Sequence, residues 1–93
     1  MQKRLGVVGI VVEDPDAVAE LNAILHESSG IIVGRMGIPY RERGLSVISL
    51  IVDGSVEEIS ALTGRLGRVP NCSVKTALSR ERQMAAPASA MEA

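Results

Sequence analysis

The chain has 93 residues, an apolar content of 46% and a formal net charge of −1. This length suits a single domain, and the near balance of charge excludes a broad electrostatic attraction to nucleic acid or to an anionic membrane. Aliphatic residues supply nearly all of the apolar content, with Tyr40 as the sole aromatic residue, which favours β-strands. Cys72 is the only cysteine, so no internal disulfide can form, which suits a reducing compartment.

The first element expected is a strand from Lys3 to Val12. The run is too short to span a bilayer, Gly6 and Gly9 interrupt it, and the acidic residues Glu13 and Asp14 follow it. We therefore interpret it as a strand buried on both faces of a sheet rather than as a signal peptide. This interpretation predicts a cytoplasmic protein that has no association with a membrane.

A helix is expected next, because Asp14 supplies an N-cap carboxylate and Pro15 suits the first helical position. Its buried side should be formed by the apolar residues that recur at helical spacing, which are Val18, Leu21, Ile24 and Leu25. Gly30 is expected to end the helix in the left-handed conformation, which glycine adopts without a steric penalty.

Two strands joined by a hairpin are expected after this helix. The segment from Ile31 to Ile38 is predicted to be the second strand, and the segment from Pro39 to Gly44 its connection to the third. The third strand is predicted from Leu45 to Val52, and like the first it is apolar on both faces.

A second helix is predicted from a capping box, in which Ser55 is followed three residues later by Glu58. Gly67 and Pro70 lie where this helix must end, and Gly64 within it suggests close packing against a neighbouring element. The stripe expected to be buried consists of Val56, Ile59, Leu62, Leu66 and Val69.

A weaker fourth strand is predicted from Asn71 to Leu78. The order βαββαβ is typical of an α+β ferredoxin-like two-layer sandwich, with antiparallel sheet order 4-1-3-2. Strands one and three are central in such a sheet, which agrees with their apolar character, while the edge strands two and four carry Arg35 and Lys75. Residues 1–79 are therefore expected to form the domain, and residues 80–93, which lack a periodic apolar face, a flexible tail.

Two helices can cover only one face of a four-stranded sheet, so the other face is expected to be open. Apolar residues alternate along the two central strands, and those expected to face the helices are Val8, Ile10, Val12, Ile48, Leu50 and Val52. The open face would then carry Leu5, Val7, Val11, Leu45, Val47 and Ile51. A contiguous apolar patch of this kind usually marks an interface. We therefore expect a homo-oligomer, either a dimer or a tetramer; the alternative is a monomer with a sticky surface.

Residue types argue against several functions that this fold can support. Modules that bind RNA need aromatic residues on the open face, and metal-carrying domains need a pair of cysteines; this chain offers neither. No phosphate-binding loop, metal-binding helix pair or nucleophile elbow is present. The single His26 is more typical of a solvated or capping side chain than of a ligand, and Cys72 of a small hydrophobe. We therefore expect no catalytic residue and no metal site, and the sequence leaves the identity of any cofactor unknown.

The most suggestive polar group consists of Arg35, Tyr40, Arg41 and Arg43. Several donors and an aromatic ring on an edge strand and its hairpin could hold an anionic effector. The alternative is that these residues make a charged, soluble hairpin in which Arg35 protects an edge strand from unwanted pairing.

Five segments in register resemble the iron-only hydrogenase system regulator family, and the likeness spans almost all of residues 4–80. The segments are Val11–Asp14, Leu21–His26, Arg35–Pro39 with Arg41 and Glu42, Ala61–Gly67, and Val74–Thr76. The resemblance implies an ACT-like ferredoxin fold, self-association and a regulatory role linked to hydrogenase systems. It supplies no catalytic or ligand-binding residue to carry over.

The sequence therefore predicts a small oligomeric regulatory or sensor module that is not an enzyme. A small-molecule effector would bind at a subunit interface, near the helix start at Asp14 and Pro15 or near the hairpin. The alternative is a protein-interaction module that docks on a maturation or redox enzyme without a small-molecule ligand. Because no separate DNA-binding segment precedes the first strand, direct contact with nucleic acid is not expected.

Overall fold

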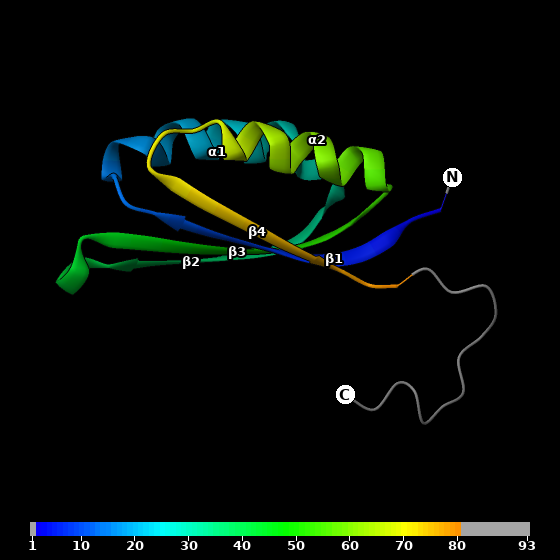
Figure 1. Ribbon diagram of the computed structural model, residues 1–93, viewed down its shortest axis with the longest axis horizontal. Coiled ribbons are helices and arrows are strands. Elements are labelled where there is room, and N and C mark those ends of the chain that lie inside the picture. Colours follow the sequence, from blue (N-terminus) through cyan, green and yellow to red (C-terminus); the bar gives the residue numbers. More distant parts are fainter. Residues whose placement is uncertain (1, 81–93) are drawn as a thin grey trace, which may run out of the picture.

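The computed structural model describes residues 2–80, which fold into two layers (Figure 1). One layer is a four-stranded antiparallel sheet in the order β2-β3-β1-β4, and the other consists of two helices that cover one face of it. The elements are β1 (Arg4–Val12), α1 (Val18–Glu27), β2 (Ile32–Tyr40), β3 (Leu45–Gly54), α2 (Val56–Gly67) and β4 (Cys72–Leu78). The order 4-1-3-2, counted from the opposite edge, and the ferredoxin-like fold are therefore confirmed. Residues 81–93, most of the predicted tail, lie outside the described residues.

The core lies between the layers and is built by the alternation of the two central strands. Val8 and Ile10 of β1 and Leu50 and Val52 of β3 are completely buried beneath the helices. From the helices, Leu21 and Leu66 are also fully buried. The expected buried stripe of α1 is thus largely correct, although Val18 is only partly buried.

Both helix starts follow the predicted capping chemistry. The side chain of Asp14 accepts a hydrogen bond from the backbone N–H of Asp16, but the turn that follows is a short 3₁₀ helix (Pro15–Ala17), and α1 begins only at Val18. At α2 the capping box is complete, because Ser55 and Glu58 exchange two hydrogen bonds of 3.1 and 2.9 Å. Hydrogen bonding from Ser55 to the Glu58 carboxyl, first from its backbone N–H and then from its side chain, holds the pKa of that carboxyl below its usual value.

Three detailed expectations are wrong: the role of Gly30, the bounds of the second strand and the burial of Val56. Gly30 lies in a 3₁₀ turn (Ser29–Ile31) after α1 and does not adopt a positive φ; within residues 2–80 the positive φ values belong to Gly44 and Asn71. The second strand begins at Ile32 and continues to Tyr40, two residues beyond the predicted end, because Pro39 and Tyr40 still pair with β3. Val56, expected in the buried stripe of α2, is 39% exposed.

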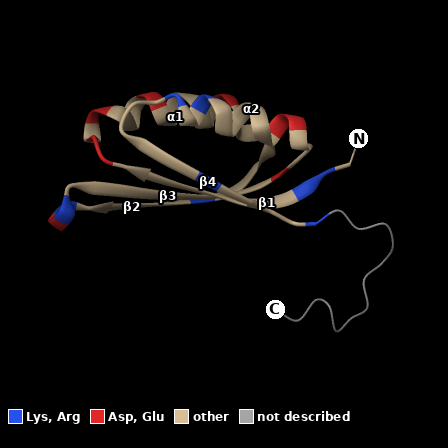
Figure 2. Ribbon diagram, in the orientation of Figure 1, with Lys and Arg blue, Asp and Glu red and all other residues tan. Residues whose placement is uncertain are grey.

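The charged residues lie mainly on the outer sides of the helices and at the ends of the sheet, whereas the strands are mostly uncharged (Figure 2). An exposed ion pair between Arg65 of α2 and Glu27 of α1 joins the two helices. No helix within residues 2–80 is long and apolar enough to cross a membrane.

Two glycines show opposite packing, which corrects the interpretation of Gly64. A Cβ atom added at Gly64 would have no atom within 4 Å, so this glycine has no packing role against a neighbouring element. At Gly6 of β1, by contrast, an added Cβ would lie 2.5 Å from a methyl carbon of Leu78 and 3.0 Å from the carbonyl oxygen of Ala77. Close approach of β4 to β1 therefore requires a glycine at position 6.

Replacing each of these glycines by alanine should change stability in opposite directions. Gly64→Ala should raise the free energy of unfolding by about 0.5–1 kcal/mol, because alanine restricts the unfolded chain and favours a helix. Gly6→Ala should lower it by about 1–3 kcal/mol, because the added methyl group overpacks the β1–β4 contact. Urea denaturation followed by circular dichroism measures both, and equal effects of the same sign would contradict this account.

Candidate functional site

A groove separates α1 from the edge strand β2 because the residues of β2 that face the helices fill little of the space there. Arg35 and Gly37 pair with Leu50 and Ile48, which are buried beneath the helices, so both residues point to the helix layer. Glycine has no side chain, and a long arginine leaves space along its stem. A Cβ added at Gly37 would only just reach Ile48, at 4.0 Å. We call this space the α1–β2 groove.

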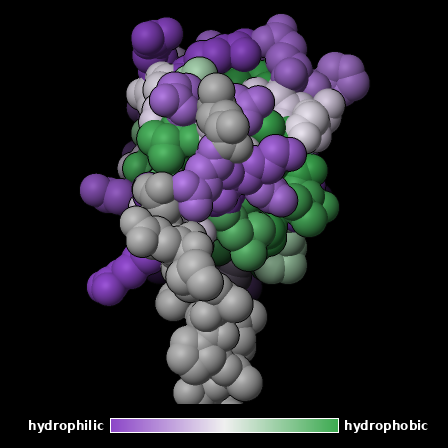
Figure 3. All heavy atoms as spheres, turned by 90° about the vertical axis from the view of Figure 1, so that its right-hand side faces the viewer, coloured by the Kyte–Doolittle hydropathy of each residue, from purple (hydrophilic) through white to green (hydrophobic). Residues whose placement is uncertain are grey.

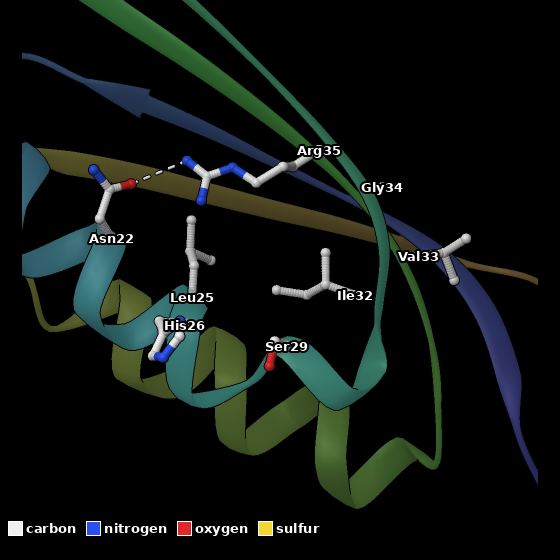
Figure 4. A pocket seen from close by; sticks show the side chains of 8 residues that line it. All are labelled: Asn22, Leu25, His26, Ser29, Ile32, Val33, Gly34 and Arg35. Carbon is white, nitrogen blue, oxygen red and sulfur yellow. Dashed lines mark hydrogen bonds between the residues drawn. The ribbon is translucent and has the colours of Figure 1, made fainter.

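The first compartment of the α1–β2 groove has a volume of about 450 Å³. Figure 4 shows Arg35 reaching from β2 to Asn22 of α1, while the apolar side chains of Leu25 and Ile32 lie below this contact and Val33 points away. The residues that line it are Asn22, Leu25, His26 and Ser29 on the helix side, and Ile32, Val33, Gly34 and Arg35 on the strand side.

The guanidinium group of Arg35 is the electrostatic centre of this groove. One of its terminal nitrogens donates a hydrogen bond of 3.0 Å to the amide oxygen of Asn22, which carries no charge. Within residues 2–80 no carboxylate forms an ion pair with Arg35, and no acidic residue lines the groove. An arginine has five N–H donors, so most of its hydrogen-bonding capacity and its full positive charge are available to a ligand.

A second compartment of about 240 Å³ continues the α1–β2 groove beyond Arg35. It shares Asn22 and Arg35 with the first compartment, so Arg35 lies between the two. Its other lining residues are mostly apolar, and they are Val18, Gly37, Ile38, Pro39, Ser46 and Ile48. The groove thus offers a cation in the middle and a hydrocarbon-like wall at one end.

The open face of the sheet is the second surface that the helices leave uncovered. Leu5 is 55% exposed and Val47 is 42% exposed, on the face opposite the helices. The apolar positions of this face are Leu5, Val7 and Val11 of β1 and Leu45, Val47 and Ile51 of β3, as expected, and also Met36, Ile38 and Tyr40 of β2. In an end view, apolar side chains reach the surface in the lower half of the molecule (Figure 3). We call these nine residues the open-face patch.

The contribution of β2 to the open-face patch was not predicted. A register shift between Ile32 and Gly34 changes which residues of β2 face each side, so Met36, Ile38 and Tyr40 face away from the helices. Alternation alone cannot place a bulge, because the extra residue leaves no mark in the hydrophobic pattern. The open-face patch is divided by a central row of small and polar residues, in which Ser49, Gly9 and Lys75 are neighbours across the strands.

The four residues predicted to bind an effector do not form one cluster within a protomer. Arg35 faces the helix layer, whereas Tyr40 pairs with Leu45 and lies on the opposite, open face. Arg41 and Arg43 lie in a 3₁₀ turn between β2 and β3, beyond the end of the strand. Successive residues of a strand point to opposite faces, so Arg35 and Tyr40, which are an odd number of positions apart, lie on opposite sides of the sheet.

Neither His26 nor Cys72 belongs to a metal-binding cluster in the part of the chain that the structure describes. Within the described residues no three side chains of His, Cys, Asp or Glu gather closely enough to hold a metal ion. His26 lines the first compartment of the α1–β2 groove. Burial, together with the nearby carboxylates of Glu20, Asp14 and Glu13, raises the pKa of the Cys72 thiol. A raised pKa disfavours the reactive thiolate, which argues against a redox role.

Comparison with known proteins now assigns the family. A family model described as "TM1266-like: Iron-only hydrogenase system regulator, putative" matches residues 4–76. The solved structure of protein TM1266 from Thermotoga maritima is 36% identical, with a TM-score of 0.81, and the match covers 85% of this chain and 100% of that one. This chain belongs to the iron-only hydrogenase system regulator family. Membership in a family of regulators favours a non-enzymatic role.

More distant structures share only the fold. A structure described as a "putative glycine cleavage system transcriptional repressor" is 12% identical with a TM-score of 0.66, and the match covers 92% of this chain and 51% of that one. The C-terminal domain of the MgtC protein from Mycobacterium tuberculosis is also 12% identical with a TM-score of 0.66, over 86% of this chain and 92% of that domain. No curated protein matches the chain. The ACT-like ferredoxin fold that the resemblance implied is thereby confirmed.

The thiol of Cys72 should be alkylated slowly in the folded protein. Because its raised pKa lowers the thiolate fraction, iodoacetamide at about pH 8 should react several-fold more slowly than with the same chain unfolded in urea. Mass spectrometry of the modified protein over time measures both rates. A folded-state rate equal to or above the unfolded rate would show that Cys72 is an activated thiol.

Proposed function

We propose that the chain is an oligomeric regulatory module of an iron-only hydrogenase system, whose copies associate through the open-face patch and respond to a small effector. Family membership supports the regulatory role. The observation that carries the assembly is the exposure of the open-face patch, where aliphatic side chains of three adjacent strands lie side by side. The row of Ser49, Gly9 and Lys75 crosses the patch, but soluble monomers rarely leave this many large apolar side chains exposed on one face.

A second copy of the chain is the partner that we propose for the open-face patch. Each copy presents the same surface, so a two-fold contact would bury it on both chains at once. The open face carries two charged residues beside the patch, Lys75 in the central row and Asp53 opposite Leu5, so stacking two patches would desolvate few charges. These aliphatic side chains are already about half buried in the protomer, so covering each of them contributes about 1 kcal/mol before the cost of association is subtracted.

The effector site is proposed among Arg35, Tyr40, Arg41 and Arg43, which could hold an anion by charge-assisted hydrogen bonds. Since Arg35 faces the helices and Tyr40 the open face, these residues make two candidate half-sites. One is the α1–β2 groove around Arg35, and the other is the hairpin with Arg41 and Arg43. The hairpin half-site adjoins the open-face patch through Tyr40, which supports an effector near a subunit interface.

A protein-interaction module is the second candidate function, and the open-face patch supports it as well. In that case a maturation or redox enzyme, not a second copy, would cover the patch. The oligomeric state separates the two functions, because a purified chain that remains monomeric leaves its patch available to another protein.

Replacing Val47 by Glu should dissociate the oligomer. Val47 lies in the open-face patch and is 42% exposed in the protomer, so its replacement leaves the core intact and places a charge where the second copy would pack. Sedimentation equilibrium should show a dimer or tetramer for the wild type, and self-association weakened by about tenfold or more for Val47→Glu.

The matched control is Val56→Glu, which introduces the same residue at a similarly exposed valine (39%) on the helix layer. It should associate as the wild type does, and circular dichroism should show that both variants fold. A wild-type chain that remains monomeric at high concentration, or equal weakening by both variants, would contradict the proposed assembly.

A further inference from the structure

We propose that the α1–β2 groove binds a small aliphatic monocarboxylate, whose carboxylate is held by Arg35 and whose hydrocarbon part lies in the second compartment. The inference rests on the proposed function, because it names the chemistry and the site of the effector. It selects the groove, not the hairpin, as the half-site that is occupied.

The anionic part of the ligand follows from the surroundings of Arg35. The guanidinium is oriented by a 3.0 Å hydrogen bond to the amide oxygen of Asn22, which fixes its position without neutralising its charge. Planar guanidinium groups bind carboxylates through two parallel hydrogen bonds. The hydroxyl of Ser29 and the imidazole of His26 line the same compartment and can donate hydrogen bonds as well.

The groove has no acidic lining residue, which disfavours amino acids as ligands. An amino acid carries an ammonium group beside its carboxylate, and an ammonium group is bound best by a carboxylate of the protein. None of the residues that line either compartment is Asp or Glu. Bringing an ammonium group beside Arg35 would also oppose two like charges. The groove therefore favours a carboxylate that has no amino group.

The hydrocarbon part follows from the space beside Gly37. The second compartment is walled by Val18, Pro39 and the nearly buried Ile48. An added Cβ at Gly37 would have Ile48 at 4.0 Å as its nearest neighbour, so the position is open to a ligand. Moving a branched aliphatic group from water to such a wall is favourable. Phosphate has no hydrocarbon part and acetate has only one methyl group, so neither would benefit much. Arg35 is the one Lys or Arg among the residues that line the groove, which favours a ligand with a single negative charge.

The binding test uses the full chain and follows its backbone amides by ¹H–¹⁵N NMR during titration. The probes are isovalerate, valine, acetate and phosphate; isovalerate and valine differ by the α-ammonium group. Isovalerate should bind about tenfold more tightly than valine and more tightly than acetate or phosphate, with shifts at Gly34, Arg35 and Gly37.

Four variants assign the contacts. Arg35→Gln removes the cation, and Asn22→Asp keeps it but neutralises it with a carboxylate; each should weaken isovalerate binding about tenfold. Gly37→Val fills the second compartment, so it should reduce the affinity for isovalerate to that for acetate. Arg68→Gln removes the same charge from an exposed position outside the groove and should leave binding unchanged.

Several results would overturn the inference: no shifts in the groove with isovalerate, equal affinity for valine or phosphate, or full binding by Arg35→Gln. Loss of binding only on replacing Arg41 and Arg43 would move the effector to the hairpin. Sedimentation of the same samples separates the two proposals. An oligomer that binds no isovalerate refutes the groove alone, and a monomer that binds isovalerate refutes the assembly alone.

Discussion

The structure depends on a mismatch between two helices and a sheet whose central strands are aliphatic on both faces. α1 and α2 bury Val8, Ile10, Leu50 and Val52 completely, and this contact makes the core. The same two strands present aliphatic side chains on their other face, where no element of the described chain covers them. Burial of the helix-facing side chains drives folding, and the apolar side chains of the other face stay exposed to solvent.

β2 connects the two surfaces that the helices leave uncovered. Its helix-facing residues, Arg35 and Gly37, line the α1–β2 groove, and its alternate residues, Met36, Ile38 and Tyr40, belong to the open-face patch. A ligand that orders this edge strand from one side would also order the side that a second copy would cover. The two proposals therefore meet on one strand, which gives an effector a short physical route to the interface.

Prediction from the sequence succeeded where a single local pattern carries the information. The caps at Asp14 and Ser55 depend on side chains within three residues, and both form as expected. Prediction failed where the outcome depends on contacts between residues that are far apart in the chain. Gly64 was expected to mark close packing, but whether any atom lies near it depends on the fold. The split between Arg35 and Tyr40 follows from their odd spacing on one strand. The unpredicted register shift decides only which of the two residues faces the helices.

The sequence by itself determined the order of elements, the two central strands and the presence of more aliphatic surface than two helices can cover. These follow from hydrophobic periodicity, which each segment carries independently of the rest. Only the tertiary structure decided that β2 contributes to the open-face patch and that Arg35 reaches Asn22 across a groove. Those features arise from the register of β2 on β3 and from the position of α1 above the sheet, because contacts between segments far apart in the chain are fixed only when the layers pack.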